Sequence, residues 1–214
     1  MEYAPFRIEV YYTILDSRGT IVQKKLNYLG YPVEKAVRTD NYLINIQLTE
    51  DEIVKVAQSL IQPVTQNYTI NKAFAPEIFT YAIEIGYLPG VTDNVAHTSR
   101  EMIEDIIKKP LNPEKSVFTS FTYFLWGSID ANTIVDISTE LYNPLIQRAT
   151  ILSYNDYVYH NGMGNAIPVV TLHEDTKAEI VSLDISNEEL VALGKEGIKN
   201  PDGTRRGPLA LDML

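Results

Sequence analysis

Apolar and polar positions recur with a period of two in some stretches of the chain and with the helical period in others. Ile8, Val10 and Tyr12 alternate with their neighbours near the start, which predicts a half-buried strand. Further along, apolar residues recur on one helical face until Gly30, and glycine is a typical helix stop. The first part of the chain is therefore predicted to form, in order, a strand at 7–12, a helix at 19–30, a strand at 42–48, a helix at 51–61 and a strand at 67–70.

The same order of elements is predicted a second time, because the sequence repeats itself. When residues 53–70 are laid over residues 134–151, seven of the eighteen positions are identical, whereas unrelated sequences would share about one. The first strand likewise matches residues 82–87. The second copy is predicted to contain a strand at 82–87, a helix at 98–108, a strand at 122–129, a helix at 131–142 and a strand at 148–152.

Residues that favour helix N-termini support several of these helices. A hydroxyl side chain followed three positions later by Glu forms a capping box, which satisfies two backbone N–H groups at the helix start. Asp130 is suited to cap the helix at 131–142 by itself. Capping boxes are predicted for Thr49 with Glu52, Thr98 with Glu101, and Ser186 with Glu189, the last of which starts a helix in the C-terminal region.

These elements predict an α+β fold built from two tandem β-α-β-α-β units. A unit of about 75 residues makes only a thin two-layer structure, with helices on one face of an antiparallel sheet, and its open face and edges need covering. A second copy in the same chain supplies that cover, as a dimer partner would. We expect units at 1–74 and 75–156 and a small C-terminal segment at 157–214, with short strands at 169–172 and 179–185.

The charge and composition of the chain limit the classes of partner that it can bind. A net charge of −10 argues against nucleic acid and anionic membranes, because both bind clustered Lys and Arg. No apolar run approaches the roughly 20 residues that span a bilayer, and the first ten residues lack the pattern of a signal peptide. The chain contains no cysteine, which excludes disulfides and thiolate metal sites. We expect a cytoplasmic protein whose partners are proteins or small molecules.

Residues with the chemistry for catalysis are few and scattered. His97, His160 and His173 lack the spacing of metal ligands, and no catalytic or metal-binding residue is predicted. Residues 162–165, Gly-Met-Gly-Asn, lack the preceding strand and following helix of a phosphate loop, so a connector is expected there.

A turn-and-cap motif lies between the strand at 82–87 and the helix that follows it. Pro-Gly is typical of a tight turn, and an Asp or Asn after it is suited to cap a helix, so a structural role is favoured over ligand binding. The motif comprises Pro89, Gly90, Val91, Thr92, Asp93 and Asn94.

The chain resembles a known family most specifically in the run PGVTDNVAHTSREMIEDI, residues 89–106. This run resembles the strand-turn-helix signature of the PurS-like region of phosphoribosylformylglycinamidine synthase, the amidotransferase of purine biosynthesis. Residues 15–30 resemble a weaker form, in which Leu-Asp, two further residues and Gly precede the helix. The tandem units and the following segment, including RRGPLALD at 205–212, are similar to the N-terminal region and the start of the linker in long forms of the synthase.

The resemblance implies a supporting role for this chain. Members of the family use ATP and magnesium to transfer ammonia, released from glutamine by a glutaminase, onto the amide of formylglycinamide ribonucleotide. The PurS-like region is implied to bridge the glutaminase and the ATP-dependent synthase core. The catalytic segments of both are missing from this chain, so it is expected to hold no cofactor and no catalytic residue. Arg205 and Arg206, an adjacent arginine pair, are candidates to contact a substrate phosphate.

Two other interpretations stay open. Tandem units of this size and element order also describe ACT-like regulatory domains, which bind amino acids between paired copies. A free-standing scaffold unrelated to purines is the third interpretation. Thermal melting with amino acids and purine metabolites separates a sensor from a bridge, because a specific ligand raises the midpoint by mass action.

Overall fold

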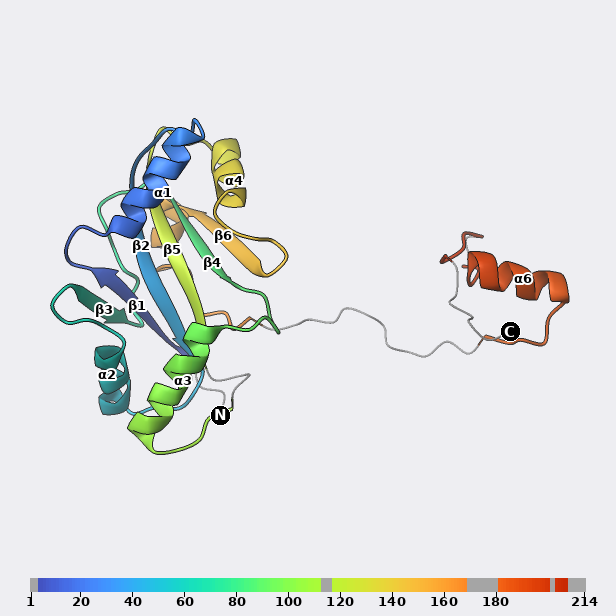
Figure 1. Ribbon diagram of the computed structural model, residues 1–214, viewed down its shortest axis with the longest axis horizontal. Helices are drawn as coiled ribbons and strands as arrows, with labels where there is room; N and C mark the ends of the chain where they lie inside the picture. Colours follow the sequence, from blue (N-terminus) through green and yellow to red (C-terminus); the bar gives the residue numbers. More distant parts are fainter. Residues whose placement is uncertain (1–3, 113–116, 169–180, 201–202, 208–214) are drawn as a thin grey trace. The chain divides into compact units, whose positions relative to one another are not determined.

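The computed structural model describes residues 4–112, 117–168, 181–200 and 203–207 (Figure 1). The chain divides into two compact units, Met1–Val170 and Thr171–Leu214. The first unit contains both copies of the repeat and continues past the expected boundary at residue 156.

A single six-stranded antiparallel sheet forms the first unit, in the order β3-β1-β2-β5-β4-β6 (Figure 1). The predicted α+β fold is confirmed at this level. The two longest strands, β2 and β5, lie side by side in the middle, so the two copies join edge to edge. The strands are β1 (Phe6–Tyr12), β2 (Val33–Ile44), β3 (Gln66–Ile70), β4 (Tyr81–Tyr87), β5 (Val117–Gly127) and β6 (Gln147–Ser153).

The pairing of β2 with β5 gives the sheet an approximate two-fold axis. Asp40 pairs with Phe121, which is its own counterpart at the offset of 81 found in the sequence. The register continues without a break on both sides of this pair, from Ala36 to Ile44. Two copies of one unit that associate through the same strand produce such a register, centred on a self-equivalent pair. The repeat in the sequence is therefore also a repeat in space.

Four helices cover one face of the sheet in two mixed pairs. The first copy contributes α1 (Ser17–Tyr28) and α2 (Glu50–Ser59), and the second contributes α3 (Asn94–Ile107) and α4 (Ala131–Thr139). Helix α2 lies beside α3, and α1 lies beside α4 (Figure 1). Because each pair combines one helix from each copy, neither copy completes a core by itself.

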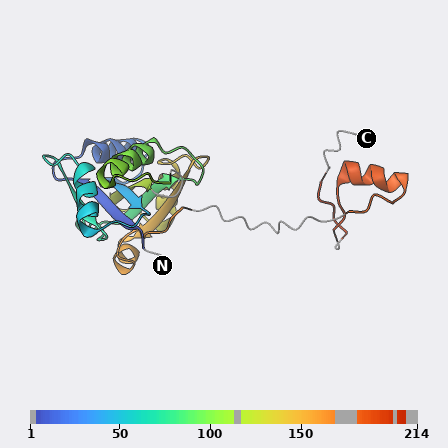
Figure 2. The ribbon, with the colours of Figure 1, turned by 90° about the horizontal axis from the view of Figure 1, so that it is seen from below.

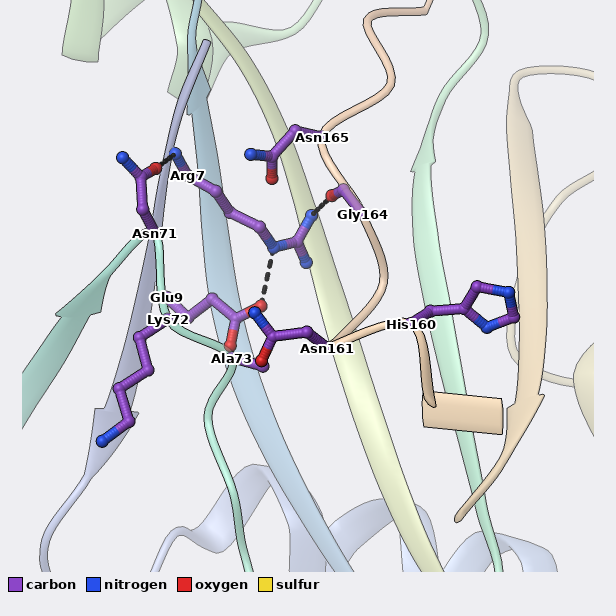
Figure 3. A pocket seen from close by; sticks show the side chains of 9 residues that line it. All are labelled: Arg7, Glu9, Asn71, Lys72, Ala73, His160, Asn161, Gly164 and Asn165. Atoms are coloured by element: carbon purple, nitrogen blue, oxygen red, sulfur yellow. Dashed lines mark hydrogen bonds and ion pairs between the residues drawn. The ribbon is translucent and has the colours of Figure 1, made fainter. Parts of the chain in front are cut away.

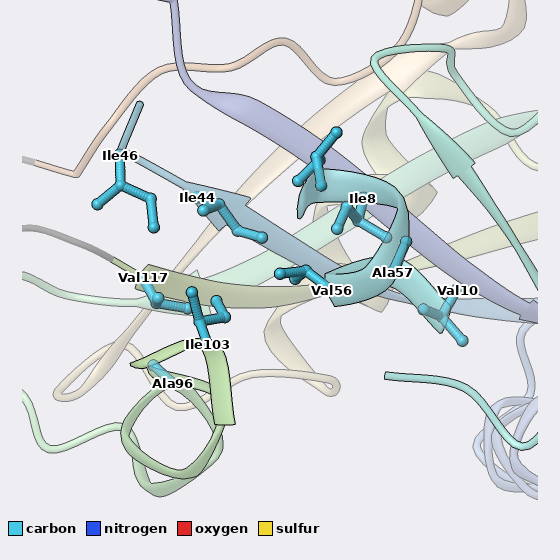
Figure 4. Packing of buried hydrophobic residues seen from close by; sticks show 10 residues of the cluster. Ile8, Val10, Ile44, Ile46, Val56, Ala57, Ala96, Ile103 and Val117 are labelled. Atoms are coloured by element: carbon cyan, nitrogen blue, oxygen red, sulfur yellow. The ribbon is translucent and has the colours of Figure 1, made fainter. Parts of the chain in front are cut away.

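A separate hydrophobic cluster lies under each helix pair. Beneath α2 and α3, Ile8 and Ile44 of the sheet pack with Val56 and Ile103 of the helices (Figure 4). Burying an aliphatic side chain of this size contributes roughly 1.5–3 kcal/mol, so the mixed helix pairs hold the two copies together as well as covering the sheet. The cluster beneath α1 and α4 contains Leu26, Ile83, Ile85, Leu125, Ile134 and Ile137.

The opposite face of the sheet is partly covered by α5 (Tyr154–Tyr159), which the hydrophobic pattern does not predict (Figure 2). Tyr157 makes edge-to-face ring contacts with Phe124 and Phe79, at centroid distances of 5.5 and 5.3 Å. The helix is six residues long, which is too short for a helical period to stand out in the sequence. The expectation of helices on one face therefore holds for α1 to α4 and fails for α5.

The glutamine shared by the two copies has a structural role in the helix-to-strand turns. Gln66 accepts a hydrogen bond from the backbone N–H of Gln62 at 2.7 Å, and Gln147 accepts one from the backbone N–H of Asn143 at 2.9 Å. Each side chain pairs with a backbone group that the turn leaves without a ladder partner. The two copies therefore share this glutamine because it stabilises the same turn in each of them.

The central strands begin earlier than predicted. β2 covers Val33–Ile44 where a strand is expected at 42–48, and β5 covers Val117–Gly127 where one is expected at 122–129. Polar residues hide the first half of β2 in the sequence, and cross-strand contacts pair them in the structure. Arg38 lies 4.2 Å from the centre of the Phe121 ring and donates to Asp40 at 2.8 Å.

Helix α3 begins at Asn94, before the expected start at residue 98. Asp93 accepts a hydrogen bond from the backbone N–H of Ala96 at 2.9 Å and is the N-cap. The capping box predicted at Thr98 is wrong, because the Thr98 hydroxyl lies inside the helix and donates to the carbonyl of Asn94 at 3.0 Å. The expectation that Asp93 or Asn94 caps a helix is confirmed.

Three other predicted caps are confirmed, and they start helices in both compact units. In the second unit, α6 (Asn187–Glu196) begins as expected. The confirmed caps are the capping box of Thr49 with Glu52 at α2, Asp130 at α4, and the capping box of Ser186 with Glu189 at α6.

The strands expected in the C-terminal region are not supported where the structure describes it. Residues 181–185, the described part of the segment 179–185, form no strand. The segment 169–172 lies outside the described residues. An isolated antiparallel bridge joins Lys199 to Arg205 instead.

Replacing Gly19 tests how closely α1 approaches the sheet. A Cβ atom at residue 19 would overlap the backbone carbonyl oxygen of Ala36, which gives a physical reason for Gly in the Leu-Asp-x-x-Gly run. Gly19→Ala should destabilise the protein by about 1–3 kcal/mol, even though Ala favours helix. Urea unfolding followed by circular dichroism measures this change. Lys24→Ala, on the exposed side of α1, is the control and should stay within about 0.5 kcal/mol of wild type.

Wild-type stability for Gly19→Ala would contradict the close packing of α1 on β2.

Candidate functional site

Charged side chains are buried on the face of the sheet opposite the four main helices. Arg7 on β1 donates from Nε to Oε1 of Glu9 at 2.6 Å. It also donates from Nη2 to Oε2 of Glu84 on β4 at 2.8 Å. None of the three side chains is more than 10% exposed. Since Glu84 belongs to the second copy, this ionic centre links the two copies across the middle of the sheet.

Hydrogen bonds extend the ionic centre over β5 and β2. The Ser120 hydroxyl donates to Oε1 of Glu84 at 2.6 Å, and Nδ2 of Asn41 donates to Ser120 at 3.3 Å. The same Nδ2 donates to the Thr122 hydroxyl at 2.8 Å, while Oδ1 of Asn41 accepts from Thr39 at 2.9 Å. Polar groups buried away from water need such partners, and a fully paired network gives the sheet one defined arrangement.

The two glutamates keep Arg7 charged. Burial alone lowers the pKa of the Arg7 guanidinium, but the charges of Glu84 and Glu9 outweigh this effect and raise that pKa above its ordinary value. A cation whose pKa is raised by folding stabilises the folded state at every pH below its unfolded pKa. The contribution of the Arg7 charge to the stability of the folded state is therefore present at neutral pH and is lost only in strong alkali.

Three chain segments cover the ionic centre. The backbone N–H of Phe74 donates to Oε2 of Glu9 at 2.6 Å, and the Tyr157 hydroxyl donates to the carbonyl of Phe74 at 2.7 Å. Burial, together with the charge of Glu9, raises the pKa of Tyr157 and keeps its hydroxyl protonated as a donor. The carbonyl of Gly164 accepts from Nη1 of Arg7 at 3.0 Å. The connector expected at residues 162–165 thus packs on the sheet.

Two cavities of about 200 Å³ border Arg7. The first lies between β1, residues 71–73 and residues 160–165 (Figure 3). There the Arg7 guanidinium reaches toward Gly164, whereas the Lys72 and His160 side chains point away from it (Figure 3). The second cavity lies on the other side, toward Arg148 of β6. This face of the sheet therefore has partly open cavities next to buried charge.

The turn-and-cap motif at residues 89–94 connects β4 to the first residue of α3. Its hydrogen bonds described below involve none of the side chains of the ionic centre. Gly90 has a φ of 83°, and the N–H of Val91 donates to the carbonyl of Leu88 at 3.1 Å, which closes a tight turn. Asp93 caps α3 and also accepts from the Thr119 hydroxyl of β5 at 2.6 Å. These contacts support the structural interpretation of the motif.

The arginine pair of the C-terminal region lies in the second compact unit. Arg205 forms an ion pair with Glu196 at 3.0 Å and donates to the carbonyl of Gly197 at 3.0 Å. Arg206 donates from Nε to Oδ1 of Asn200 at 2.7 Å. Both guanidinium groups have partners within their own unit, and a contact with a substrate phosphate stays a prediction.

The described histidines lie on the surface. Nδ1 of His97 is 3.7 Å from Glu101, and Nδ1 of His160 is 2.8 Å from the carbonyl of Asp156. His173 lies outside the described residues. Among the residues that the structure describes, no group of three or more His, Asp or Glu side chains could hold a metal ion. No helix in the same part of the chain is long and apolar enough to cross a membrane.

The ionic centre is absent from the sequence predictions, although part of its signal is present. Glu9 and Glu84 occupy the same position in the two matched strands, each between apolar residues. A charged residue that recurs in the middle of a buried strand indicates a paired, buried charge. The counterpart of Arg7 is Ala82, so comparison of the two copies does not identify the arginine that pairs with both glutamates.

Comparison with known proteins finds no family model that matches this chain and no curated protein that matches it.

Replacing Arg7 tests the ionic centre. Arg7→Met should destabilise the protein by about 3–5 kcal/mol at neutral pH, because Glu9 and Glu84 stay buried without their shared cation. Chemical unfolding in urea at neutral pH measures this loss.

Arg18→Met is the matched control for Arg7→Met. The ion pairs of Arg18 are more exposed, with 28% of its side chain accessible, so its removal should cost less than about 1 kcal/mol. Equal losses in the two variants would contradict the special role of the buried centre.

Proposed function

We propose that this chain is a non-catalytic docking region of a phosphoribosylformylglycinamidine synthase. In this role it bridges the glutaminase and the ATP-dependent synthase core and supports ammonia transfer to formylglycinamide ribonucleotide. ATP, magnesium and the catalytic residues belong to the partners. The chain contributes to an ATP-dependent C–N ligase that uses glutamine as ammonia donor, while it carries no catalytic residue of its own.

The two segments that carry the family resemblance support this proposal, because they have the same structural role in both copies. Asp16 caps α1 and Asp93 caps α3, and each lies after a strand on the outer side of the β2–β5 pair. At Gly19, α1 touches the sheet, and Ala96 takes the equivalent position in α3, where it is buried. The resemblance thus rests on residues that build the tandem unit.

Exposed apolar side chains at equivalent positions of the two copies are the observation that carries the docking role. Val54 and Val135, on the outer sides of α2 and α4, are 38% and 52% exposed. Val64 and Leu145, in the turns that follow these helices, are 82% and 83% exposed. Isolated exposed apolar residues are common on protein surfaces, but their recurrence at the same repeat positions indicates a retained contact surface.

A bridge between two proteins needs one contact surface for each of them. The duplication places these exposed apolar residues on both outer parts of the sheet, since α2 leads to the edge strand β3 and α4 leads to the edge strand β6. One such surface is assigned to the glutaminase and the other to the synthase core. The interfaces of permanent complexes are rich in apolar side chains of this kind.

Charged replacements in the turns test the docking surfaces. The double variant Val64→Asp, Leu145→Asp should bind the matching glutaminase or synthase core at least tenfold more weakly, because a carboxylate buried in an interface loses its hydration. Isothermal titration with each partner measures the affinities. Both side chains are exposed in the chain, so its thermal midpoint should stay unchanged.

Ile21→Asp is the matched control for this double variant. Ile21 is 64% exposed on α1, and its counterpart in α3 is the polar residue Thr98, so no retained contact is expected there. The control should bind both partners with wild-type affinity. Unaltered binding by the double variant would remove the docking surfaces from the proposal, and failure of the wild-type chain to bind either partner would overturn the proposal itself.

A further inference from the structure

The outer edge of β6 carries unpaired backbone groups. In an antiparallel ladder, alternate residues bond to the neighbouring strand, and the residues between them point their N–H and C=O groups the other way. The N–H of Leu88 donates to the carbonyl of Ile146 at 3.0 Å, so the even-numbered residues of β6 bond to β4. The backbone groups of Ala149 and Ile151 therefore point to the free edge. Among the residues that the structure describes, none pairs with these two N–H groups.

A side chain closes the equivalent edge of β3. Tyr68 is the counterpart of Ala149 at the offset of 81. The N–H of Thr13 donates to the carbonyl of Thr65 at 2.9 Å, so the odd-numbered residues bond to β1 and the N–H of Tyr68 points outward. Oδ1 of Asn67 accepts a hydrogen bond from this N–H at 2.8 Å. In the second copy an arginine replaces the asparagine, and its side chain has no acceptor atom for the corresponding N–H.

The edge of β6 lacks the usual protection against strand addition. Sheets protect their free edges with short strands, proline, bulges or charged side chains. β6 pairs with β4 over seven residues without a shift of register and contains no proline, whereas β3 has five residues. The charged side chain of Arg148 lies inward over β4, since a Cβ atom at Gly86 would be 3.3 Å from its Nη2 atom. The edge of β6 is therefore suited to accept another strand.

Exposed apolar residues continue the docking surface onto this edge. Leu145 and Ile146 directly precede β6 and are 83% and 41% exposed. The counterpart of Ile146 in the first copy is the polar residue Thr65, so the turn before β6 is the more apolar of the two. Leu145 belongs to the surface assigned to docking, and the unpaired backbone groups of β6 follow it in the chain. A partner that covers Leu145 is therefore placed to reach the edge of β6.

An extended segment of the partner fits this edge. The outward groups recur every second residue, at Ala149 and Ile151, which is the spacing at which another strand presents its own groups. The side chains of these two residues pack with the hydrophobic cluster beneath α1 and α4. Arg148 and Thr150 border the cavity on the opposite face. A strand beside β6 would match this alternation with apolar side chains on the helix-covered face and polar ones on the other.

We propose that the protein that docks at Leu145 adds an extended strand to the free edge of β6. The added strand pairs with the N–H and C=O groups of Ala149 and Ile151 and extends the sheet by one strand. The side chain of Asn67 occupies the equivalent N–H of β3, so strand addition is expected at one edge only. This inference rests on the proposed docking role and specifies how one of the two docking surfaces binds its partner.

Proline at residue 149 tests the strand addition. Ala149→Pro removes an outward N–H and leaves the bonds between β4 and β6 in place, because proline is tolerated on an edge strand where its nitrogen faces solvent. Isothermal titration with the matching glutaminase and with the synthase core measures the affinities. The variant should bind one of these partners at least roughly tenfold more weakly and the other with wild-type affinity.

Ala149→Val is the matched control, since valine has a similar volume to proline and keeps the N–H. It should bind both partners within about threefold of wild type. Hydrogen exchange of the wild-type chain gives a second readout and decides alone if Ala149→Pro does not fold. In the complex, the amides of Ala149 and Ile151 should exchange at least roughly tenfold more slowly than in the free chain, while the amide of Tyr68 should be unchanged.

The outcomes separate strand addition from the docking role. Equal affinities of wild type and Ala149→Pro for both partners, or unchanged exchange at Ala149 and Ile151 in the complex, would overturn strand addition and leave docking in place. Protection of both amides in the free chain that grows with its concentration would assign the edge to a second copy and would also overturn the inference. Failure of the wild-type chain to bind either partner would overturn the docking role, and strand addition with it.

Discussion

The whole first unit depends on the antiparallel pairing of β2 with β5. This pairing joins the two copies at Asp40 and Phe121 and turns two thin units into one six-stranded sheet. It also brings α2 beside α3 and α1 beside α4, so that each hydrophobic cluster draws on both copies. On the other face, the same pairing puts Glu84 within reach of Arg7. A single copy would keep an exposed strand edge, half of each cluster and an unpaired Glu84 in its buried strand.

The two faces of the sheet have different roles as a consequence. The helix-covered face is apolar and nearly symmetric, and it supplies most of the stability. The opposite face carries the ionic centre, α5 and the cavities, where the copies differ most. The Tyr11 ring packs on Phe74 in the first copy there, while the Arg148 guanidinium lies over Gly86 in the second. Duplication followed by divergence on one face gives a symmetric scaffold with an asymmetric surface.

The sequence predicts the order of the elements, most helix caps and the internal repeat, because these features depend on local patterns and on identities between the copies. It does not predict the length of β2, since Arg38 and Asp40 look like loop residues until the ring of Phe121 lies beside them. It also misses Arg7, whose importance arises from its contact with Glu84 on another strand. Long-range pairing decides the surroundings of such residues, and a local pattern does not contain it. The recurrence of Glu9 and Glu84 is the part of the site that the sequence does reveal.

The most direct test of the bridging role is glutamine-dependent amidotransfer by the matching synthase core and glutaminase, measured with and without residues 1–214. The account predicts that ammonia transfer from glutamine appears only when the chain is present, while the core keeps its activity with free ammonium in either case. Equal glutamine-dependent activity with and without the chain would contradict the account.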